Sequence, residues 1–291
     1  MRGPTTDGSG AQRLQRRLPL GARAWTLLTI ALGGLIAARY LDLSIAGLIP
    51  RDAGWALLKE LGAAALHPAL DYEESVVPGT PPFLARIGAA LWTTLLFAVA
   101  AMSLALPAGL SLGVLASDRF WSLQSGRSQG LGRMLQVSLR IVIALLRSLH
   151  ELLWAVLFLA AIGLNGAAAI FAIAIPFAGT LAKVSSEMID ETSTSPPQAL
   201  RGAGAGGLAA LAVGVLPAAA PDLLSYAFYR FECAIRSAAV LGFFGYPTIG
   251  LYVAQSFDNY QLREVWSYLY ALIALVLIVE AWSRAVRRRL S

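Results

Sequence analysis

Six ionisable residues lie inside two strongly apolar stretches, where charges are rare and usually serve a purpose. They are Arg147, His150 and Glu151 in LLRSLHELLW, and Arg230, Glu232 and Arg236 in YRFECAIRS. A charge near the centre of a bilayer costs about 2.5–3.5 kcal/mol, so these side chains should face protein or water. They could clasp helices together, or they could line the route of an anion. The sequence alone leaves both interpretations open.

Helical spacing indicates which residues of each group share one face of a helix. Glu232 and Arg236 are four residues apart, with the acid first, which is the favourable order for an ion pair on one face. Arg230 points elsewhere on the same helix and needs another partner. The group at 147–151 has the i, i+3, i+4 spacing of a second shared face. We expect the two groups to meet at the centre of a helical bundle. Their arginines outnumber their glutamates, which suits an oxyanion.

The composition indicates where such a bundle would lie. Of 291 residues, 57% are hydrophobic and 14% are charged. Soluble domains have about 45–50% apolar and about 25% charged residues, so both deviations predict a polytopic membrane protein. The single cysteine, Cys233, excludes an intrachain disulfide and a cysteine-rich metal site.

Apolar runs of sufficient length occur six times, since about 20 residues cross a bilayer. The expected spans are 24–41, 83–116, 136–162, 165–187, 218–245 and 264–283. Residues 1–23 are a basic tail; the run after it could be a cleaved signal, but no clear small-x-small site closes it, which favours an anchor. Residues 42–82 are expected outside, and 83–290 form the main domain. We predict an all-α polytopic membrane protein with six transmembrane helices.

Basic residues collect on one side of these spans. With the N-terminus inside, the inner segments hold five arginines in the tail, three in loop 117–133 and four after the last span. The outer segments hold only Arg51, Lys59 and Arg263 away from the span ends. For a bacterial inner-membrane protein, surrounded by lipid, the positive-inside rule would place both termini in the cytoplasm. The net charge of +6 is a topology signal, and no nucleic-acid partner is expected.

Patterns typical of cofactor chemistry lack their context. GAGAGG at 202–207 fits G-x-G-x-x-G, but Pro196 and Pro197 precede it and an apolar span follows, so it is no dinucleotide site. HELLW at His150 lacks the second histidine of the zinc motif. No G-x-x-x-x-G-K-[ST] loop occurs in the chain. We expect no cofactor, no metal and no covalent catalysis; if ATP drives this protein, another chain binds it.

The polar loop after the fourth span carries a motif. Residues 198–217, QALRGAGAGGLAALAVGVLP, resemble the signature loop of permeases of binding-protein-dependent ABC importers. Their pattern is Glu-Ala-Ala, three residues, Gly, nine residues, an aliphatic, any residue and Leu-Pro. The matching positions are Ala199, Gly204, Leu216 and Pro217. Leu200 stands at the second alanine, and the departures are Gln198 and Gly214.

The resemblance extends over residues 84–290. RSLHELLWA, LAKVSSE and YRFECAIRSAAVLG look like the phosphonate-type branch of these permeases, although Tyr246-Pro247-Thr248 replace small residues of its next turn. The resemblance implies a type I importer core and a dimer, most simply a homodimer. It also implies separate ATPase subunits docked on loop 188–217 and an external substrate-binding protein. The translocation pathway would carry a phosphonate-like or other small oxyanion.

Two other classes remain. A proton-coupled secondary transporter would use Glu151 and Glu232 as a relay and often shows an internal repeat, which we do not see between the halves. An intramembrane enzyme would need a reactive constellation. The sequence does not name the solute.

Overall fold

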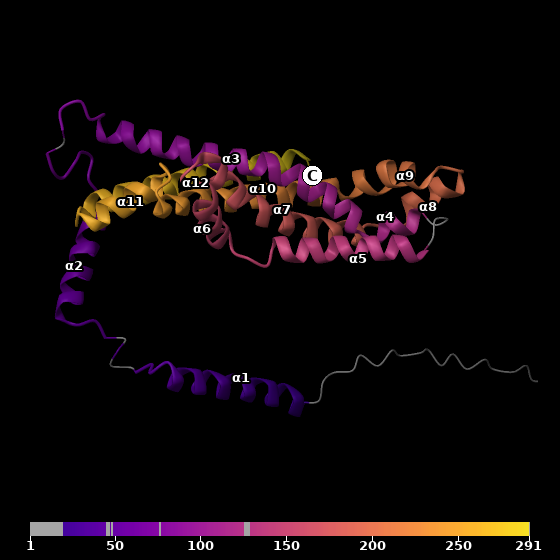
Figure 1. Ribbon diagram of the computed structural model, residues 1–291, viewed down its shortest axis with the longest axis horizontal. Coiled ribbons are helices and arrows are strands. Elements are labelled where there is room, and N and C mark those ends of the chain that lie inside the picture. The colour runs from indigo at the N-terminus through magenta and orange to yellow at the C-terminus, as the bar shows by residue number, and fades with distance from the viewer. Residues whose placement is uncertain (1–19, 45–46, 48, 76, 125–128, 291) are drawn as a thin grey trace, which may run out of the picture. The chain divides into compact units, whose positions relative to one another are not determined.

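The computed structural model describes residues 20–44, 47, 49–75, 77–124 and 129–290. These residues form helices and connecting loops, with no strand among them, as the sequence predicts (Figure 1). The chain divides into two units, Met1–Lys59 and Glu60–Ser291. The predicted tail at 1–23 lies almost wholly outside the described residues.

The first unit contains α1 (Leu20–Tyr40), which agrees with the expected first span. Its apolar part, Ala24–Tyr40, is shorter than each of the four candidate spans of the second unit. Helix α2 (Asp52–Leu66) runs across the boundary between the two units.

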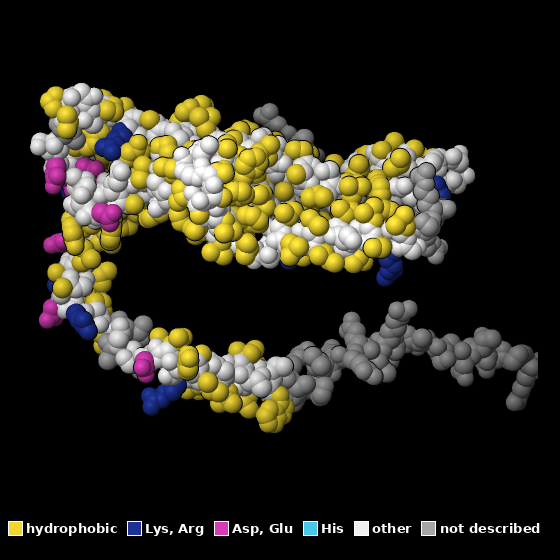
Figure 2. Space-filling view, in the orientation of Figure 1, with side chains coloured by type: hydrophobic (Ala, Val, Ile, Leu, Met, Phe, Trp, Pro, Cys, Tyr) yellow, Lys and Arg dark blue, Asp and Glu magenta, His cyan; other side chains and the backbone are white. Residues whose placement is uncertain are grey.

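The second unit is a bundle in which α3, α7, α10 and α12 pack on one another. Its elements are α3 (Phe83–Ala116), α4 (Asp118–Leu123), α5 (Gln129–Leu146), α6 (Glu151–Ile162), α7 (Gly166–Glu191), α8 (Ser195–Gly202), α9 (Gly207–Ala210), a π-helical turn (Leu211–Val215), α10 (Leu216–Val240), a 3-10 turn (Leu241–Phe244), α11 (Ile249–Asp258) and α12 (Leu262–Leu290). On the face seen in Figure 2, apolar side chains cover the middle of the bundle, as lipid contact requires.

The described residues include four helical stretches long and apolar enough to cross a membrane, and five if one bent pair counts as a span. The predicted number of six is therefore not confirmed. The run expected as one span at 136–162 is two helices, α5 and α6, bent by 83° at a short break. His150 causes the new start, because its Nδ1 accepts a hydrogen bond from the Leu152 N–H, 3.3 Å away, and so caps α6.

Small residues hold α3 and α7 together. A Cβ at Gly109 would lie 2.6 Å from Leu181 Cβ, and one at Gly113 would lie 2.9 Å from Ser185 Cβ. The two glycines form a G-x-x-x-G pattern, which lets helix backbones approach closely where lipid offers no hydrophobic drive for packing. Buried alanines continue this seam, among them Ala101, Ala105 and Ala172.

Residues 61–82, expected outside the membrane, are fastened to the start of α12. Trp266 Nε1 donates to Leu61 O at 2.8 Å, and Tyr270 Oη donates to Ala65 O at 2.8 Å. The buried Glu264 carboxylate accepts a hydrogen bond from the Glu73 N–H at 2.9 Å. This polar clamp covers one end of the bundle.

Glu73 offers a pH test of this clamp. Burial is the largest cause that raises the pKa of its carboxyl above the ordinary value, and the neighbouring Glu264 charge adds to it. A raised folded-state pKa gives stability that is complete below the unfolded pKa and lost as pH rises through the folded pKa. Glu73→Gln keeps an oxygen to accept from the Arg263 N–H, 3.1 Å away in the native chain. We expect the variant to be more heat-stable than wild type at pH 7, with the advantage disappearing at pH 4.

Thermal unfolding in detergent at the two pH values measures this difference. Glu74→Gln is the matched control: the Glu74 charge is the smallest of the causes acting on the pKa of Glu73, so the effect of this variant should have the same sign and be clearly smaller. A Glu73→Gln variant less stable than wild type at pH 7 would show that the charge itself holds the clamp.

Candidate functional site

The segment at 188–217, which we call the coupling segment after the sequence prediction, begins in the last turn of α7, ends at the start of α10 and folds between them into a compact double turn. Helix α8 and helix α9 are joined by a turn in which Gly204 has φ +88°. This left-handed conformation suits glycine, since a Cβ there is strained. Gln198, Ala199 and Gly204 are exposed, and Leu208 at the tip is 63% exposed. The sequence-predicted docking residues thus share one exposed element, with Leu216 and Pro217 at its return into α10.

The underside of the coupling segment packs tightly. A Cβ at Gly214 would lie 3.0 Å from the Pro197 backbone, so glycine at this position lets α8 lie against the π-helical turn. This explains why the chain departs from an aliphatic residue at Gly214. A Cβ at Gly207 would collide with the Leu123 carbonyl, so α9 sits directly on the end of α4. Movement of the double turn must therefore move α4.

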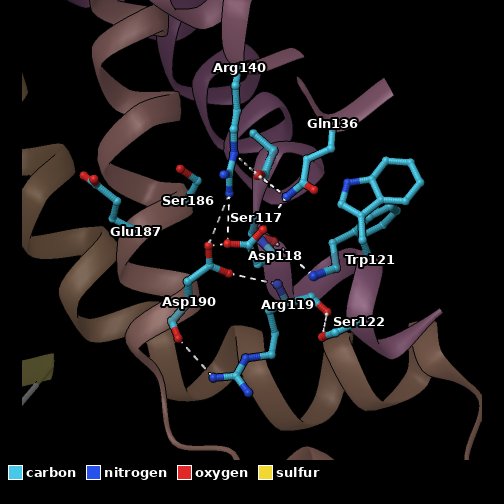
Figure 3. A network of polar contacts seen from close by, with 12 residues as sticks. Ser117, Asp118, Arg119, Trp121, Ser122, Gln136, Arg140, Ser186, Glu187 and Asp190 are labelled. Atoms are coloured by element: carbon cyan, nitrogen blue, oxygen red, sulfur yellow. Dashed lines mark hydrogen bonds and ion pairs between the residues drawn. The ribbon is translucent and has the colours of Figure 1, made fainter. Parts of the chain in front are cut away.

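A polar clasp ties α4 to the ends of two long helices (Figure 3). The Asp190 carboxylate, at the end of α7, accepts from the Asp118 N–H at 3.0 Å and from the Arg119 N–H at 2.9 Å. Arg119 returns two hydrogen bonds, to Asp190 O at 3.0 Å and to Thr192 O at 2.7 Å. Asp190 thus accepts from backbone N–H groups at the start of α4, and Arg119 of α4 donates to backbone carbonyls at the end of α7. Neither helix can satisfy these terminal groups alone.

Helix α5 joins the same clasp. Arg140 lies 3.2 Å from the Asp118 carboxylate and donates from Nε to Ala116 O at 3.1 Å. Gln136 Nε2 donates to Asp118 Oδ1 at 2.7 Å, and this bond is the main cause of the lowered pKa of Asp118. We call the set Asp118, Arg119, Gln136, Arg140 and Asp190 the clasp. Sequence reasoning missed it; the two aspartates at apolar–polar borders were its only signal.

The six ionisable residues lie in three places, and among them only Glu232 is buried. His150, Glu151, Arg230 and Arg236 line one open cavity of about 340 Å³, together with Cys233 and Ser237. We call this the arginine cavity. The two groups thus meet in these four residues, from α10 and from the start of α6, but at an open cavity where His150 and Arg236 are exposed and not at the centre of the bundle.

The other two residues lie elsewhere. Arg147 ends beside a different cavity, with Arg140 and Lys183, because the break before α6 turns it away from Glu151. Glu232 approaches Arg287 of α12 at 3.8 Å, so the expected pair with Arg236 is replaced by a contact with another helix. Arg236 instead donates to Cys233 Sγ at 3.3 Å.

Nothing in the described part of the chain groups histidine, cysteine and carboxylates into a set that could hold a metal ion. The arrangement offers charges and hydrogen-bond donors in an open cavity, and separately a coupling segment whose α9 contacts α4 beside the clasp. Such a site can bind and pass a solute without changing its bonds.

Solved structures of ABC transporters share this fold. Inward-facing conformations of the MetNI methionine ABC transporter superpose with a TM-score of 0.62 at 18% identity, covering 72% of this chain and 97% of that one. An amino acid ABC transporter solved with histidines gives a TM-score of 0.59 at 17% identity, over 72% of this chain and 99% of that one. These likenesses show the fold, which is that of a type I ABC importer permease.

The family follows from the sequence match. Residues 89–291 match the family of binding-protein-dependent transport system inner membrane components, and the chain belongs to that family. It is therefore a multi-pass membrane protein of a transport system. The resemblance predicted from its motifs is confirmed.

Named relatives fall in the phosphonate-type branch. The phosphite transport system permease PtxC of Stutzerimonas stutzeri is 32% identical over 149 residues, 51% of this chain and 54% of the relative. The phosphate-import permease PhnE of Mycolicibacterium smegmatis is 30% identical over 211 residues, 72% of this chain and 38% of the relative. The putative phosphite permease HtxE of S. stutzeri is 30% identical over 170 residues, 58% of this chain and 65% of the relative. The matches to these three thus span less than two thirds of each relative's length.

Proposed function

We propose that the chain is the permease subunit of an ABC importer for a phosphonate-like or other small oxyanion. Two copies would form the translocation pathway, most simply as a homodimer, and an external substrate-binding protein would deliver the solute. Separate ATPase subunits would bind ATP and dock on the coupling segment, and both termini would lie in the cytoplasm. The observation that carries this proposal is the exposed α8–α9 turn, which contacts α4 and rests on a buried cluster shared with α7 and α10.

The coupling segment has the two properties that a docking element needs. Its tip presents Leu208 and a backbone free of large side chains around Gly204, so a partner can approach closely. Its base rests on a buried cluster of Ile189, Leu211, Val215 and Ala219. A push on the tip therefore displaces α7 and α10 together rather than bending a loose loop.

The arginine cavity supports the choice of solute. The cavity holds more arginines than carboxylates. Relatives of the chain by sequence are named for phosphite, phosphate and phosphonate. Guanidinium groups match tetrahedral oxyanions, because their donors form paired hydrogen bonds to two oxygens. A pathway must still release its solute, and the carboxylate of Glu151 keeps the site from being strongly positive.

Co-purification with a candidate ABC ATPase from the same organism tests the proposal. The complex, reconstituted in liposomes with a candidate binding protein, should hydrolyse ATP faster when phosphite, phosphate or methylphosphonate is added. Stable association and stimulation by one of these anions are the expected results. Transport that survives ATP depletion and collapses with the proton gradient would instead identify a secondary transporter, with Glu151 and Glu232 as the next residues to change.

Gly204→Trp tests the docking surface. A side chain at φ +88° strains the turn, and indole bulk covers the surface where the ATPase would sit, so we expect the ATPase to be lost on purification. Gly130→Trp places the same bulk on an open position of α5 and should leave the complex intact. A Gly204→Trp permease that retains both its ATPase and transport would refute the assignment of the coupling segment.

A further inference from the structure

We propose that the arginine cavity is an oxyanion-binding site within the permease itself, with Arg230 and Arg236 as the anion ligands. The solute would then pause in this subunit during transport, rather than being selected only by the external binding protein. The inference rests on the proposed function and deepens it, because it assigns the substrate class to named side chains.

The two arginines have no anionic partner in the part of the chain that the structure describes. Arg230 stacks its guanidinium 3.9 Å from the centre of the Phe177 ring, and its buried Nε has no hydrogen-bond partner. Arg236 donates only to a thiol. Both lie within reach of the same cavity. The Arg230 Nε is closed off from solvent, but the terminal N–H groups of the two arginines have no oxygen acceptor among the described residues, so an anion in the cavity would give them one.

Several other arginines of the bundle have a carboxylate partner. Arg140, Arg263 and Arg287 each have a carboxylate within 4 Å. Glu232, the nearest carboxylate in the sequence to Arg230, is turned to Arg287 instead. Glu232 therefore does not neutralise Arg230, and among the described residues neither arginine at the cavity has a carboxylate contact of the kind that holds Arg140, Arg263 and Arg287.

The start of α6 adds a third favourable element. The break after α5 places the first turn of this 12-residue helix at the cavity, where His150, Glu151 and Leu152 line it. A helix N-terminus carries about half a positive charge, and broken helices in other transporters direct such ends at anionic solutes.

Glu151 limits the strength of the site. One of its oxygens accepts from Ser237 Oγ at 2.8 Å, and the other lies 3.5 Å from His150 Nε2. The cavity thus holds two arginines against one engaged carboxylate, a net charge of +1 with His150 neutral. A volume of about 340 Å³ leaves room for a small tetrahedral anion and water.

The open side of the cavity fits a pathway. Arg236 is exposed, yet it lies eight residues before the end of the apolar run at Phe244, about 12 Å along the helix. An arginine at that depth should not face lipid. The open side must therefore face water or a second subunit, which is where a solute would enter.

Cys233 is a native reporter for this site. It is the only cysteine of the chain, it is half-buried, and it lines the cavity between the two arginines. In the purified permease–ATPase complex, its rate of reaction with an anionic methanethiosulfonate is measured with increasing phosphite, phosphate or methylphosphonate. We expect at least one of these to slow labelling in a saturable manner, whereas chloride at equal ionic strength does not.

Arg230→Gln should weaken the protection about tenfold or more, since a charge-assisted hydrogen bond is lost. Arg230→Lys should restore part of it. The matched control is Arg86→Gln, because Arg86 also stacks on a ring, 4.5 Å from the centre of Tyr252, but lies outside the cavity. Size-exclusion profiles of all three variants show whether each remains folded.

Several results would overturn the proposal. They are an unreactive Cys233, equal slowing by chloride, and full protection in Arg230→Gln. Wild-type transport of phosphite without any protection of Cys233 would reject the site while leaving the importer function intact. Protection of Cys233 without ATP-driven transport would reject the importer function while leaving the anion site intact. The two proposals therefore fail separately.

Discussion

Gly109→Leu is expected to separate α3 from α7 and to remove most of the folded permease from the membrane. A Cβ added at Gly109 would lie only 2.6 Å from Leu181 Cβ and 3.0 Å from the Ala178 carbonyl oxygen. A backbone contact cannot move aside as a flexible side chain can, so the cost should reach or exceed the upper end of the ~1–3 kcal/mol typical of overpacking. That is a large share of a typical stability of about 5–15 kcal/mol.

The same helix provides the control. Gly88 has open space around the position of its Cβ, so Gly88→Leu adds the same side chain without a collision. The measurement is the fraction of monodisperse protein that remains after stepwise heating in detergent, together with the amount found in membranes. Gly109→Leu should show a lower midpoint and lower abundance than Gly88→Leu. Equal values for the two variants would mean that α3 and α7 are not packed as closely as the structure has them.

Helices with uninterrupted apolar runs are predictable from the sequence, because length and hydropathy are local properties. The run at 83–116 coincides with α3, and the run at 165–187 begins one residue before α7. The break between α5 and α6 was not predicted, since the flanking residues are apolar on both sides. Its signal was present in SLHE: a capping side chain followed by an acid in the first helical turn.

The partners of the charged residues were harder to predict. Helical spacing reports which residues share a face, but it does not report what faces them. Glu232 has Arg236 one turn away and approaches Arg287 instead, which lies 55 residues later on α12. The arginine cavity could be anticipated as a region, because charges in apolar runs must be sheltered. The exclusion of Arg147 and Glu232 from it required the three-dimensional arrangement.

Asp190→Ala is expected to uncouple the ATPase from the permease without preventing assembly. The carboxylate accepts from the first two N–H groups of α4, and Arg140 lies 3.9 Å from it. Its removal leaves both donors without their acceptor and loosens α4 from α7. Hydrogen bonds to a charged group contribute about 1.5–3 kcal/mol, so the end of the bundle should lose about that much stability.

The functional consequence follows from what α4 supports. Helix α9 rests on the end of α4 at Leu123, so a loosened α4 would let the coupling segment move without moving α7. We expect basal ATP hydrolysis to persist while its stimulation by solute and binding protein falls about fivefold or more, which corresponds to about 1 kcal/mol of coupling. Liposome assays of hydrolysis and uptake measure both quantities in one preparation.

Glu187→Ala separates this effect from a simple loss of negative charge. Glu187 lies one turn earlier on α7 and pairs with Lys183, and both side chains of this pair are largely exposed. An exposed pair of this kind contributes about 0–1 kcal/mol, so the control should couple normally. If Asp190→Ala also couples normally, force from the coupling segment reaches α7 through the apolar cluster around Ile189 alone, and the clasp is only a helix cap. If solute stimulation is lost with Asp190→Ala and kept with Glu187→Ala, the clasp is the rigid link between ATP hydrolysis and the pathway.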